Sequence, residues 1–305
     1  MELYFLGTGA AVPSKERNVS SLALRFFGRK KRCWLFDCGE GTQHQLLHAP
    51  VKLSQMERIF ISHLHGDHLF GLPGLLGSRS FQTDSPLTIY GPPGIEAFVK
   101  TALTTSQTHL RYPLEVKELK EGLIYEEKGY RVTALSLAHG IPSFGYRIEE
   151  EEQPGSLKVD ELKKLGLPPG PLYKELKEGK TIQLPDGRKI RGTDFVGSPK
   201  PGRTLAILGD TRPTANAVTL ARGVDVLVHE ATYRADQEER AAVYHHSTSV
   251  QAAETAQEAG VGVLILTHIS ARYGEEEGEE LLAEARKIFP NTYLAHDFWS
   301  YPILR

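Results

Sequence analysis

The sequence predicts an α/β fold built from stacked layers of sheet and helix, and two patterns along the chain predict it. Six short runs of apolar and β-branched residues, typical of buried strands, each end at a His, Asp or Glu near Gly, Ser or Thr. Stretches rich in Ala and Glu, with the spacing of amphipathic helices, fall between these runs. Strands and helices mixed at this density indicate stacked layers and not a helical bundle.

The predicted elements follow one rhythm along the chain. The strands cover residues 32–36, 59–61, 130–138, 205–208, 224–228 and 263–266, and the clearest helices cover 94–103, 249–259 and 278–288. The residues that follow the strands are Asp37, His63, His139, Asp210, His229 with Glu230, and His268. Rigid strands hold such residues in place while the adjoining loops admit a substrate. The rhythm therefore predicts one polar site at the strand ends.

Composition is that of an ordinary globular protein. Of the 305 residues, 40% are hydrophobic and 24% are charged, and the formal net charge is -2. Because the whole chain is not basic, any contact with RNA must use a local patch. The longest apolar runs, such as residues 261–266, fall far short of the roughly 20 residues that a membrane helix needs. No contact with a membrane is expected.

Cys33 and Cys38 are the two cysteines of the chain. An odd separation within one strand points their side chains to opposite faces, so we expect two free thiols. Free thiols and an N-terminus without a basic export signal predict a cytoplasmic protein. Cys38 is expected to be a packing residue, close to the site without being a ligand.

Residues 153–200 interrupt the rhythm of strands and polar ends. The segment is rich in Gly, Pro and Lys, with a turn-forming cluster at 166–171. It holds ten basic residues against six acidic ones, although the acidic run at 149–152 offsets this excess where it is included. We expect a single domain over residues 1–305 into which 153–200 is inserted.

Four closely spaced residues form the strongest candidate metal site. His63 and His65 are two apart, so both imidazoles point to one side of an extended chain, and Gly66 permits a turn that brings Asp67 and His68 to a second position nearby. Without a metal, such a cluster would leave costly, poorly paired polar groups. Imidazole and carboxylate ligands without thiolate suit zinc, manganese or cobalt. The isolated histidines are expected to be surface or core residues: His44, His48, His109 and His296.

The pattern His-x-His-x-Asp-His, followed at a distance by a separate His, Asp and His, resembles that of the metallo-β-lactamase superfamily. The resemblance covers most of the chain and implies a four-layer αβ/βα sandwich. It implies two Zn²⁺ ions per subunit, with Mn²⁺ or Co²⁺ as possible substitutes. The implied ligands are His63, His65 and His139 for one ion, Asp67, His68 and His268 for the other, and Asp210 as a bridge between them.

Two divalent metals roughly 3.5 to 4 Å apart can activate a shared hydroxide and neutralise charge on a phosphoryl group in transfer. Such a site suits hydrolysis but does not identify the substrate, because the superfamily also covers lactams, lactones and thioesters.

Four passages resemble the short form of ribonuclease Z, an endonuclease that processes the 3′ end of transfer RNA. They are the loop at 13–18 with Lys15, Arg17 and Asn18, the motif at 229–232, the motif at 246–248, and the inserted segment with Gly170, Pro171 and Lys177. The loop supplies Lys15 and Arg17 as free contacts for phosphates. The resemblance implies that the segment 153–200 is a flexible arm that grips the body of precursor transfer RNA through phosphate contacts. It also implies a homodimer.

The same resemblance implies a division of catalytic roles. Asp67 holds and deprotonates the attacking water, and His246 assists the departing 3′ oxygen while Glu230 orients its ring. His245 is the less suitable neighbour for that role. The implied products are a tRNA with a 3′ hydroxyl and a trailer with a 5′ phosphate.

Two other functions fit part of the pattern. The chain could hydrolyse small molecules, as a cyclic phosphodiesterase, an arylsulfatase-like enzyme or a lactonase does. Alternatively, it could be a binding protein that retains a metal only for folding. The complete ligand set with Glu230 and His246 argues against the second alternative.

Overall fold

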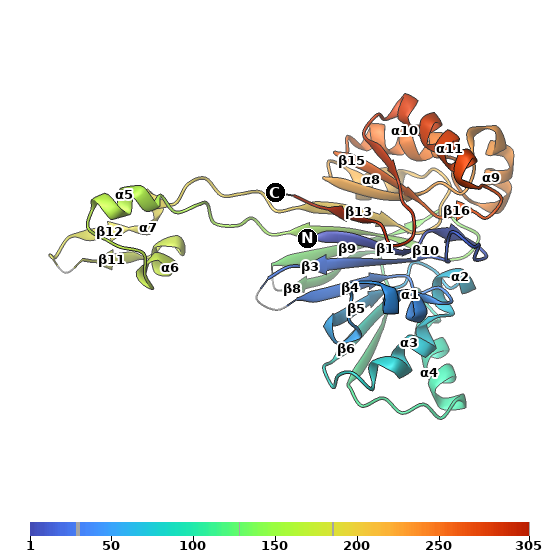
Figure 1. The fold of residues 1–305 in the computed structure, drawn as a ribbon, viewed down its shortest axis with the longest axis horizontal. Helices are drawn as coiled ribbons and strands as arrows, with labels where there is room; N and C mark the ends of the chain where they lie inside the picture. Colours follow the sequence, from blue (N-terminus) through green and yellow to red (C-terminus); the bar gives the residue numbers. More distant parts are fainter. Residues whose placement is uncertain (29–30, 128, 185, 305) are drawn as a thin grey trace. The chain divides into compact units, whose positions relative to one another are not determined.

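The structure, a computed structural model, describes residues 1–28, 31–127, 129–184 and 186–304. The chain forms two units, shown in Figure 1. Unit 1 comprises Met1–Ile148 and Thr204–Leu304, and unit 2 comprises Glu149–Arg203. None of the helices in the described ranges is long and apolar enough to cross a membrane.

Two large sheets build unit 1. In order across the first sheet the strands are β18 (Ser300–Pro302), β1 (Glu2–Gly7), β3 (Ser21–Phe26), β4 (Arg32–Phe36), β5 (Met56–Phe60), β6 (Leu87–Gly91) and β7 (Leu114–Glu118). Across the second they are β17 (Thr292–Leu294), β15 (Val263–Thr267), β14 (Val226–Glu230), β13 (Thr204–Leu208), β10 (Ser143–Glu150), β9 (Tyr130–Leu137) and β8 (Gly122–Glu127). The short strands β2 (Gly9–Ala10) and β16 (Ile269–Ser270) pair in parallel beside them.

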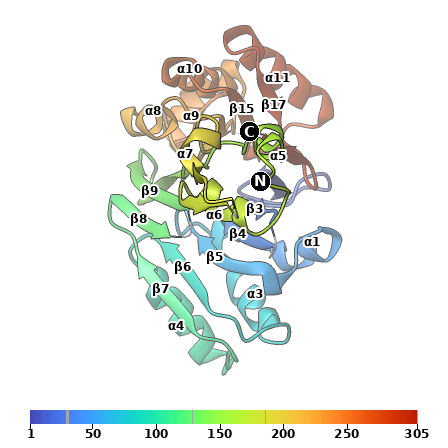
Figure 2. The ribbon, with the colours of Figure 1, turned by 90° about the vertical axis from the view of Figure 1, so that its left-hand side faces the viewer.

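Helices cover the outer face of each sheet, as Figure 2 shows. On the first sheet these are α1 (Thr42–His48), α3 (Leu72–Arg79) and α4 (Ile95–Thr105), and on the second α8 (Ala215–Ala221), α10 (Ser249–Ala259) and α11 (Glu275–Ile288). The short helices α2 (Gly66–Leu69) and α9 (Glu238–Tyr244) and the 3₁₀ turns η1 (Leu53–Gln55) and η2 (Ala235–Gln237) complete the unit.

Three apolar cores hold these four layers together. One core lies between the two sheets, and one lies between each sheet and its helices. Strand β13 contributes to two cores, because its side chains alternate between the two faces of the sheet. Leu205 and Ile207 enter the core between the sheets, whereas Ala206 and Leu208 enter the core beneath the helices. The four-layer αβ/βα arrangement predicted from the sequence is confirmed.

Several predicted elements have nearly the observed bounds, with two informative differences. Strand β14 continues to Glu230, two residues beyond the predicted end, because its parallel pairing with β15 extends to Glu230 opposite Thr267. His229 and Glu230 are therefore strand residues. Helix α11 begins at Glu275, before the predicted start at 278, because acidic residues in its first turn favour the helix dipole and Glu277 accepts a hydrogen bond from the Gly274 N–H.

The two cysteines are free and buried, as expected, but the predicted reason was wrong. Cys33 and Cys38 both lie in the core between the first sheet and its helices. Strand β4 ends at Phe36, and Asp37 adopts a left-handed conformation with φ 58°, which turns the chain before Cys38. The alternation of an extended strand therefore does not reach Cys38.

Unit 2 has secondary structure and an apolar core of its own. It contains α5 (Val159–Lys164), α6 (Leu172–Lys177), β11 (Thr181–Gln183), β12 (Lys189–Arg191) and α7 (Gly192–Phe195). Strands β11 and β12 form an antiparallel pair. The buried core residues are Leu162, Leu167, Leu176, Ile182, Leu184 and Ile190. A separate core indicates that the packing of this insert comes from its own residues.

Candidate metal centre

The candidate ligands meet at one end of unit 1 because the strands that precede them end there. His63 follows β5, Asp210 follows β13, and His268 follows β15. Asp210 enters beside Gly209, where an added Cβ would lie 2.5 Å from the Ser62 Cβ and 2.9 Å from the Phe144 carbonyl oxygen. Only glycine permits this close approach, so the residue type is dictated by the packing around the site.

Three imidazoles form the first group of candidate ligands. His65 Nδ1 lies 3.1 Å from His63 Nε2 and 3.1 Å from His139 Nε2. One potential ligand atom from each ring therefore faces a common point. His63 is fully buried, whereas His65 and His139 are more accessible.

The second group combines two imidazoles with two carboxylates. His68 Nε2 lies 3.2 Å from His268 Nε2, and Asp67 Oδ2 lies 3.4 to 3.5 Å from these two nitrogens. Asp210 Oδ2 lies 3.3 Å from His268 Nε2 and 3.4 Å from His68 Nε2, but also 3.7 Å from His63 Nε2. Asp210 thus reaches both groups, as the sequence resemblance implies for a bridging ligand.

The outer nitrogens of the rings show which atoms face inward with lone pairs. His139 Nδ1 donates to the His245 carbonyl at 2.9 Å, and His68 Nδ1 donates to the Asp37 carboxylate at 2.8 Å. Carbonyl and carboxylate oxygens only accept, so in the neutral form of each ring, the form that binds metal, Nε2 carries the lone pair. Lone pairs on ring nitrogens only 3.1 to 3.2 Å apart repel each other unless a proton or a cation lies between them.

The spacing fits a metal ion. Zinc–nitrogen bonds of about 2.0 to 2.1 Å in tetrahedral geometry place the ligand atoms about 3.3 to 3.4 Å apart. The distances within both groups, 3.1 to 3.5 Å, are close to that value. The residues present therefore fit the metal that the sequence pattern predicts.

The site also favours positive charge. Burial opposes ionisation of Asp67 and Asp210, yet neighbouring imidazoles hold the pKa of both carboxyls well below its ordinary value. Burial likewise opposes the charged form of His68, but the carboxylates of Asp210 and Asp37 raise its pKa well above the ordinary value. Burial and the adjacent imidazoles lower the pKa of His63. Neutral imidazole and ionised carboxylate are the forms that bind metal.

Asp37 is a functional candidate to which the sequence interpretation assigned no role. Its Oδ2 accepts a hydrogen bond from His68 Nδ1 at 2.8 Å and from Ser62 Oγ at 2.8 Å, and its Oδ1 accepts one from the Ser62 N–H at 2.7 Å. A carboxylate in this place orients a ligand imidazole and increases its basicity. Its position after a predicted strand, like that of the ligands, was the signal that could have identified it.

We predict that Asp37→Asn lowers zinc affinity about 10- to 100-fold, the usual cost of losing a carboxylate that orients a ligand histidine. The amide side chain keeps the shape but loses the negative charge that supports the His68 imidazole. Competition with a chromogenic chelator measures the affinity. Asp84→Asn, which alters an exposed carboxyl outside the site, is the matched control. Equal affinity of the two variants would contradict this role for Asp37.

Glu230, which is buried, and His246, which is partly exposed at the site, form a pair next to the second group. His246 Nδ1 lies 2.9 Å from Glu230 Oε1, which also accepts from the Thr211 N–H at 2.8 Å. Glu230 Oε2 accepts from Thr232 Oγ1 at 2.6 Å, and the same hydroxyl lies 2.9 Å from His268 Nδ1. The strand residue Glu230 is fixed from both sides, so it can orient the ring of His246.

Charge sets the protonation of this pair. Burial disfavours the charged imidazole, but the Glu230 carboxylate raises the pKa of His246 to about 9. Burial likewise opposes ionisation of Glu230, and His246 holds its pKa below the ordinary value. At neutral pH the pair is therefore an imidazolium and a carboxylate, and Nε2 is the nitrogen left to donate a proton.

His245 contributes to the site through its backbone. Its backbone is left-handed, with φ 61°, and its carbonyl oxygen accepts the hydrogen bond from His139 Nδ1. The turn at His245 directs the chain from α9 to His246.

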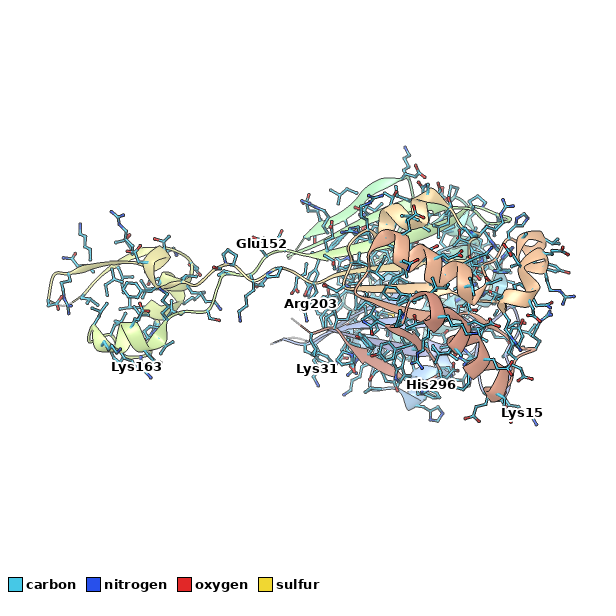
Figure 3. All side chains as sticks on the ribbon, turned by 90° about the horizontal axis from the view of Figure 1, so that it is seen from above. Lys15, Lys31, Glu152, Lys163, Arg203 and His296 are labelled. Atoms are coloured by element: carbon cyan, nitrogen blue, oxygen red, sulfur yellow. The ribbon has the colours of Figure 1, made fainter. Side chains whose placement is uncertain are left out.

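The loop at 13–18 only partly matches its predicted role. The expectation that Arg17 is free for phosphates was wrong, because its Nη1 donates to Thr8 Oγ1 at 2.7 Å and to the Ala295 carbonyl at 2.6 Å. Asn18 is also engaged, through its side-chain Nδ2 to the Glu40 carbonyl at 2.8 Å. Lys15 is exposed, and it lies at the end of unit 1 that carries the site (Figure 3). Within the described ranges it has no ion pair, which leaves it available to a substrate.

Asp297 holds this loop and was not identified from the sequence. Its Oδ2 accepts from the Asn18 N–H at 2.7 Å and from Gln45 Nε2 at 2.9 Å, and its Oδ1 accepts from Thr8 Oγ1 at 2.7 Å. Ala11, just before this loop, donates its N–H to Asp67 Oδ2 at 2.8 Å. Asp297 thus joins segments that are far apart in the sequence.

A cavity of about 530 Å³ opens over the metal-ligand candidates. Its polar lining includes His65, Asp67, His139, Asp210, His246 and His268, and its apolar lining includes Val12, Phe70 and Tyr244. None of the four histidines predicted to be unrelated to the site belongs to a metal-competent group of the described residues.

The three arm residues of the predicted site lie in unit 2. Gly170 and Pro171 line a cavity of about 590 Å³ together with other residues of the loop after α5 and with Leu184, Asp186 and Arg188, and Pro171 precedes α6. Lys177 ends α6 and is exposed, with no ion pair to any described carboxylate, whereas Lys174 and Lys180 both contact Glu178. Figure 3 shows the side chains of this unit, with Lys163 marked on α5.

Comparisons with known proteins agree with this geometry. The chain is 55% identical over its full length to the full-length ribonuclease Z of Bacillus licheniformis. Its structure is similar to that of human tRNase Z, short form, with a TM-score of 0.72 and 32% identity over the whole of both chains. It shares the fold of a Bacillus subtilis metallo-β-lactamase fold protein, with a TM-score of 0.69 and 18% identity over 98% of each chain. Residues 1–153 match a protein-family model described as Anti-Pycsar protein Apyc1.

Proposed function

The chain belongs to the ribonuclease Z family, and from that membership we propose that it is a zinc-dependent endoribonuclease that removes the 3′ trailer from precursor tRNA. The observation that carries the proposal is the convergence of seven side chains at distances that suit metal ligation, with Asp210 near both sets of imidazoles. The Glu230–His246 pair lies beside them. The chain acts as an enzyme of the cytoplasm, and two Zn²⁺ ions per subunit are its cofactors, with Mn²⁺ or Co²⁺ as substitutes.

The residues divide the chemistry between them. His63, His65 and His139 would hold one ion, Asp67, His68 and His268 the other, and Asp210 both. When bound, the pair of metals lowers the pKa of water towards neutrality and neutralises negative charge on the phosphoryl group.

Asp67 and His246 handle the protons of the reaction. The Asp67 carboxylate, held by the Ala11 N–H, orients the attacking water and accepts its proton. His246, charged at neutral pH through Glu230, donates a proton to the departing 3′ oxygen. The products are a tRNA with a 3′ hydroxyl and a trailer with a 5′ phosphate.

Incubation of the purified protein with a precursor tRNA tests the proposal directly. Cleavage just beyond the discriminator nucleotide, lost with chelator and regained with added zinc, is the expected result. A cut elsewhere, or full activity in a preparation free of transition metal, would count against it.

A second candidate function is hydrolysis of small phosphodiesters. The candidate ligands all lie in unit 1, and a two-metal site of this kind suits a small diester as well as RNA. The two functions differ in their use of unit 2, because a small diester has no body to be gripped. A ratio of kcat/KM values that favours precursor RNA over small esters supports the ribonuclease.

We propose that residues 153–200 form the arm that binds the tRNA body, with Gly170, Pro171 and Lys177 as contacts. The separate core of unit 2 supports this role, because an insert that packs by itself can present a binding surface while unit 1 retains its own fold. Lys15 on the loop at 13–18 would add a phosphate contact near the cut. The protein is further proposed to be a homodimer, as family resemblance implies.

We predict that deletion of residues 155–191 lowers kcat/KM for precursor tRNA about 100-fold or more, since several phosphate contacts are lost. Hydrolysis of bis(p-nitrophenyl) phosphate should stay within about twofold, because the cores and ligands of unit 1 do not use the deleted residues. Steady-state kinetics on both substrates checks the prediction. Equal losses on both substrates would contradict the role of the arm.

A further inference from the structure

We propose that two exposed aromatic side chains, Phe70 and Tyr244, stack on the nucleobases that flank the cut. Tyr244 would contact the nucleotide whose 3′ oxygen departs, and Phe70 the nucleotide that keeps the phosphate. This inference rests on the proposed ribonuclease function and adds the residues that select for unpaired bases at the cleavage site.

Phe70 is an exposed ring in a fixed position. It is 63% exposed, although it follows α2 directly at the metal centre. Its ring lies against Gly66, where an added Cβ would come within 2.4 Å of the Phe70 Cε2 atom. Its N–H donates to the Gly66 carbonyl at 2.8 Å. The ring is therefore held beside His65 and Asp67, while much of its surface stays in water.

Tyr244 is placed in a comparable way on another helix. It is 59% exposed and ends α9, two residues before His246. The intervening His245 has a left-handed backbone and donates its N–H to the Ala242 carbonyl, so the turn between Tyr244 and His246 is defined. Tyr244 thus lies close to the group that protonates the leaving oxygen.

Both rings line the same cavity as the candidate ligands. In Figure 1, α2 lies beside the helices of the first sheet and α9 beside α11 of the second, at the same end of unit 1. The lining of the cavity therefore combines metal-competent residues with one aromatic residue from each half of unit 1. At about 530 Å³ it is larger than the ions and a phosphate require.

The chemistry of this lining fits a single-stranded nucleic acid. Two exposed aromatic rings beside a polar site offer apolar surface, and covering that surface with a ligand stabilises the complex. Every nucleobase has a π-face, so stacking on Phe or Tyr contributes affinity without reading base identity. Bases that are paired in a duplex cannot splay onto the two rings. The cavity therefore selects an unpaired junction and tolerates many sequences.

The positions of the two rings assign them to different nucleotides. His246 serves the departing 3′ oxygen, so the adjacent Tyr244 is nearest to the nucleotide on the 5′ side of the cut. Phe70 comes from the other half of unit 1, next to α2, so it is assigned to the nucleotide on the 3′ side of the cut.

Abasic substrates test the assignment. We expect Tyr244→Ala and Phe70→Ala each to lower kcat/KM on an intact precursor tRNA about 5- to 150-fold, the equivalent of about 1 to 3 kcal/mol for one stacked base. With the base removed on the 5′ side of the cut, Tyr244→Ala should equal the wild type while Phe70→Ala stays impaired. With the base removed on the 3′ side, the pattern should reverse. Tyr244→Phe should retain activity on all substrates.

Phe81→Ala is the matched control, because Phe81 is 82% exposed and does not line the cavity. It should behave as the wild type. A loss in Tyr244→Ala or Phe70→Ala that is the same with and without the bases, or a loss in Tyr244→Phe, would overturn the stacking role. If the wild type does not cut the precursor at all, the proposed function fails. If it does cut, and the loss in each variant is the same on intact and abasic substrates, only this inference fails.

Discussion

Asp67→Ala should lower cleavage of precursor tRNA by at least about 10³-fold, a typical loss for a group that both positions and activates the attacking water. The substitution removes the oxygen that lies within 3.5 Å of His68 Nε2 and His268 Nε2 and accepts the Ala11 N–H. The loop at the cavity edge therefore loses this anchor as well. Binding of the tRNA body should remain within about twofold, because the contacts proposed for it lie in unit 2.

Single-turnover cleavage and a binding assay by filter retention, both on the same labelled precursor, separate the two effects. Asp67→Asn retains the shape of the side chain and should lose nearly as much activity as Asp67→Ala. This result would show that the loss comes from the missing proton acceptor and not from a packing defect. Asp84→Ala, at an exposed position, should match the wild type. Retained turnover in Asp67→Ala would remove Asp67 from the mechanism.

His246→Ala should lower the rate of cleavage about 10²- to 10⁴-fold, the range for loss of a positioned general acid. A precursor with sulfur in place of the departing 3′ oxygen tests the role, because a thiolate leaves without a proton. The variant should cut this substrate at nearly the wild-type rate. An equal defect on both substrates would mean that His246 acts in another way.

The pH dependence follows from the same pair. Although burial opposes it, the Glu230 carboxylate raises the pKa of His246 to about 9, so the active imidazolium is present below that pH and is lost above it. The rate should therefore fall on the alkaline side near pH 9. Glu230→Gln removes the negative charge beside His246, so the pH at which the rate falls should shift towards neutral. If the rate of Glu230→Gln falls at the same pH as that of the wild type, His246 is excluded as the group responsible.

Much of the fold could be predicted because local patterns and tertiary packing agree. Helix α10 has the predicted bounds of 249–259, since Thr248 and Gln251 cap its start and Gly260 ends it in a left-handed conformation. The strand runs were recognisable because buried strands exclude charge, and the polar residue that ends each run marks where the chain reaches the site. The strand β14 was predicted too short, because its polar residues His229 and Glu230 are buried by the neighbouring strand β15.

The candidate ligands could be predicted from spacing and resemblance, but their supporting residues could not. Asp37 contacts His68, 31 positions away, and Asp297 contacts Thr8, 289 positions away. The place of Asp37 after a strand marks it as a candidate, but nothing in the local sequence of either aspartate shows which distant residue its carboxylate contacts. Arg17 was misjudged for the same reason, because the charge of its side chain is visible in the sequence while its hydrogen bonds to Thr8 and Ala295 are not.

The sequence by itself determined the layered fold, the cluster His63, His65, Asp67 and His68, and the distinct character of residues 153–200. These features depend on periodicity, residue type and short spacing, which are properties of neighbours along the chain. Only the tertiary structure decided that Asp210 reaches both ligand groups, that Asp37 supports His68, and that Phe70 and Tyr244 line one cavity. Those relations arise where strand ends and helices from both sheets meet, and packing in space sets these distances.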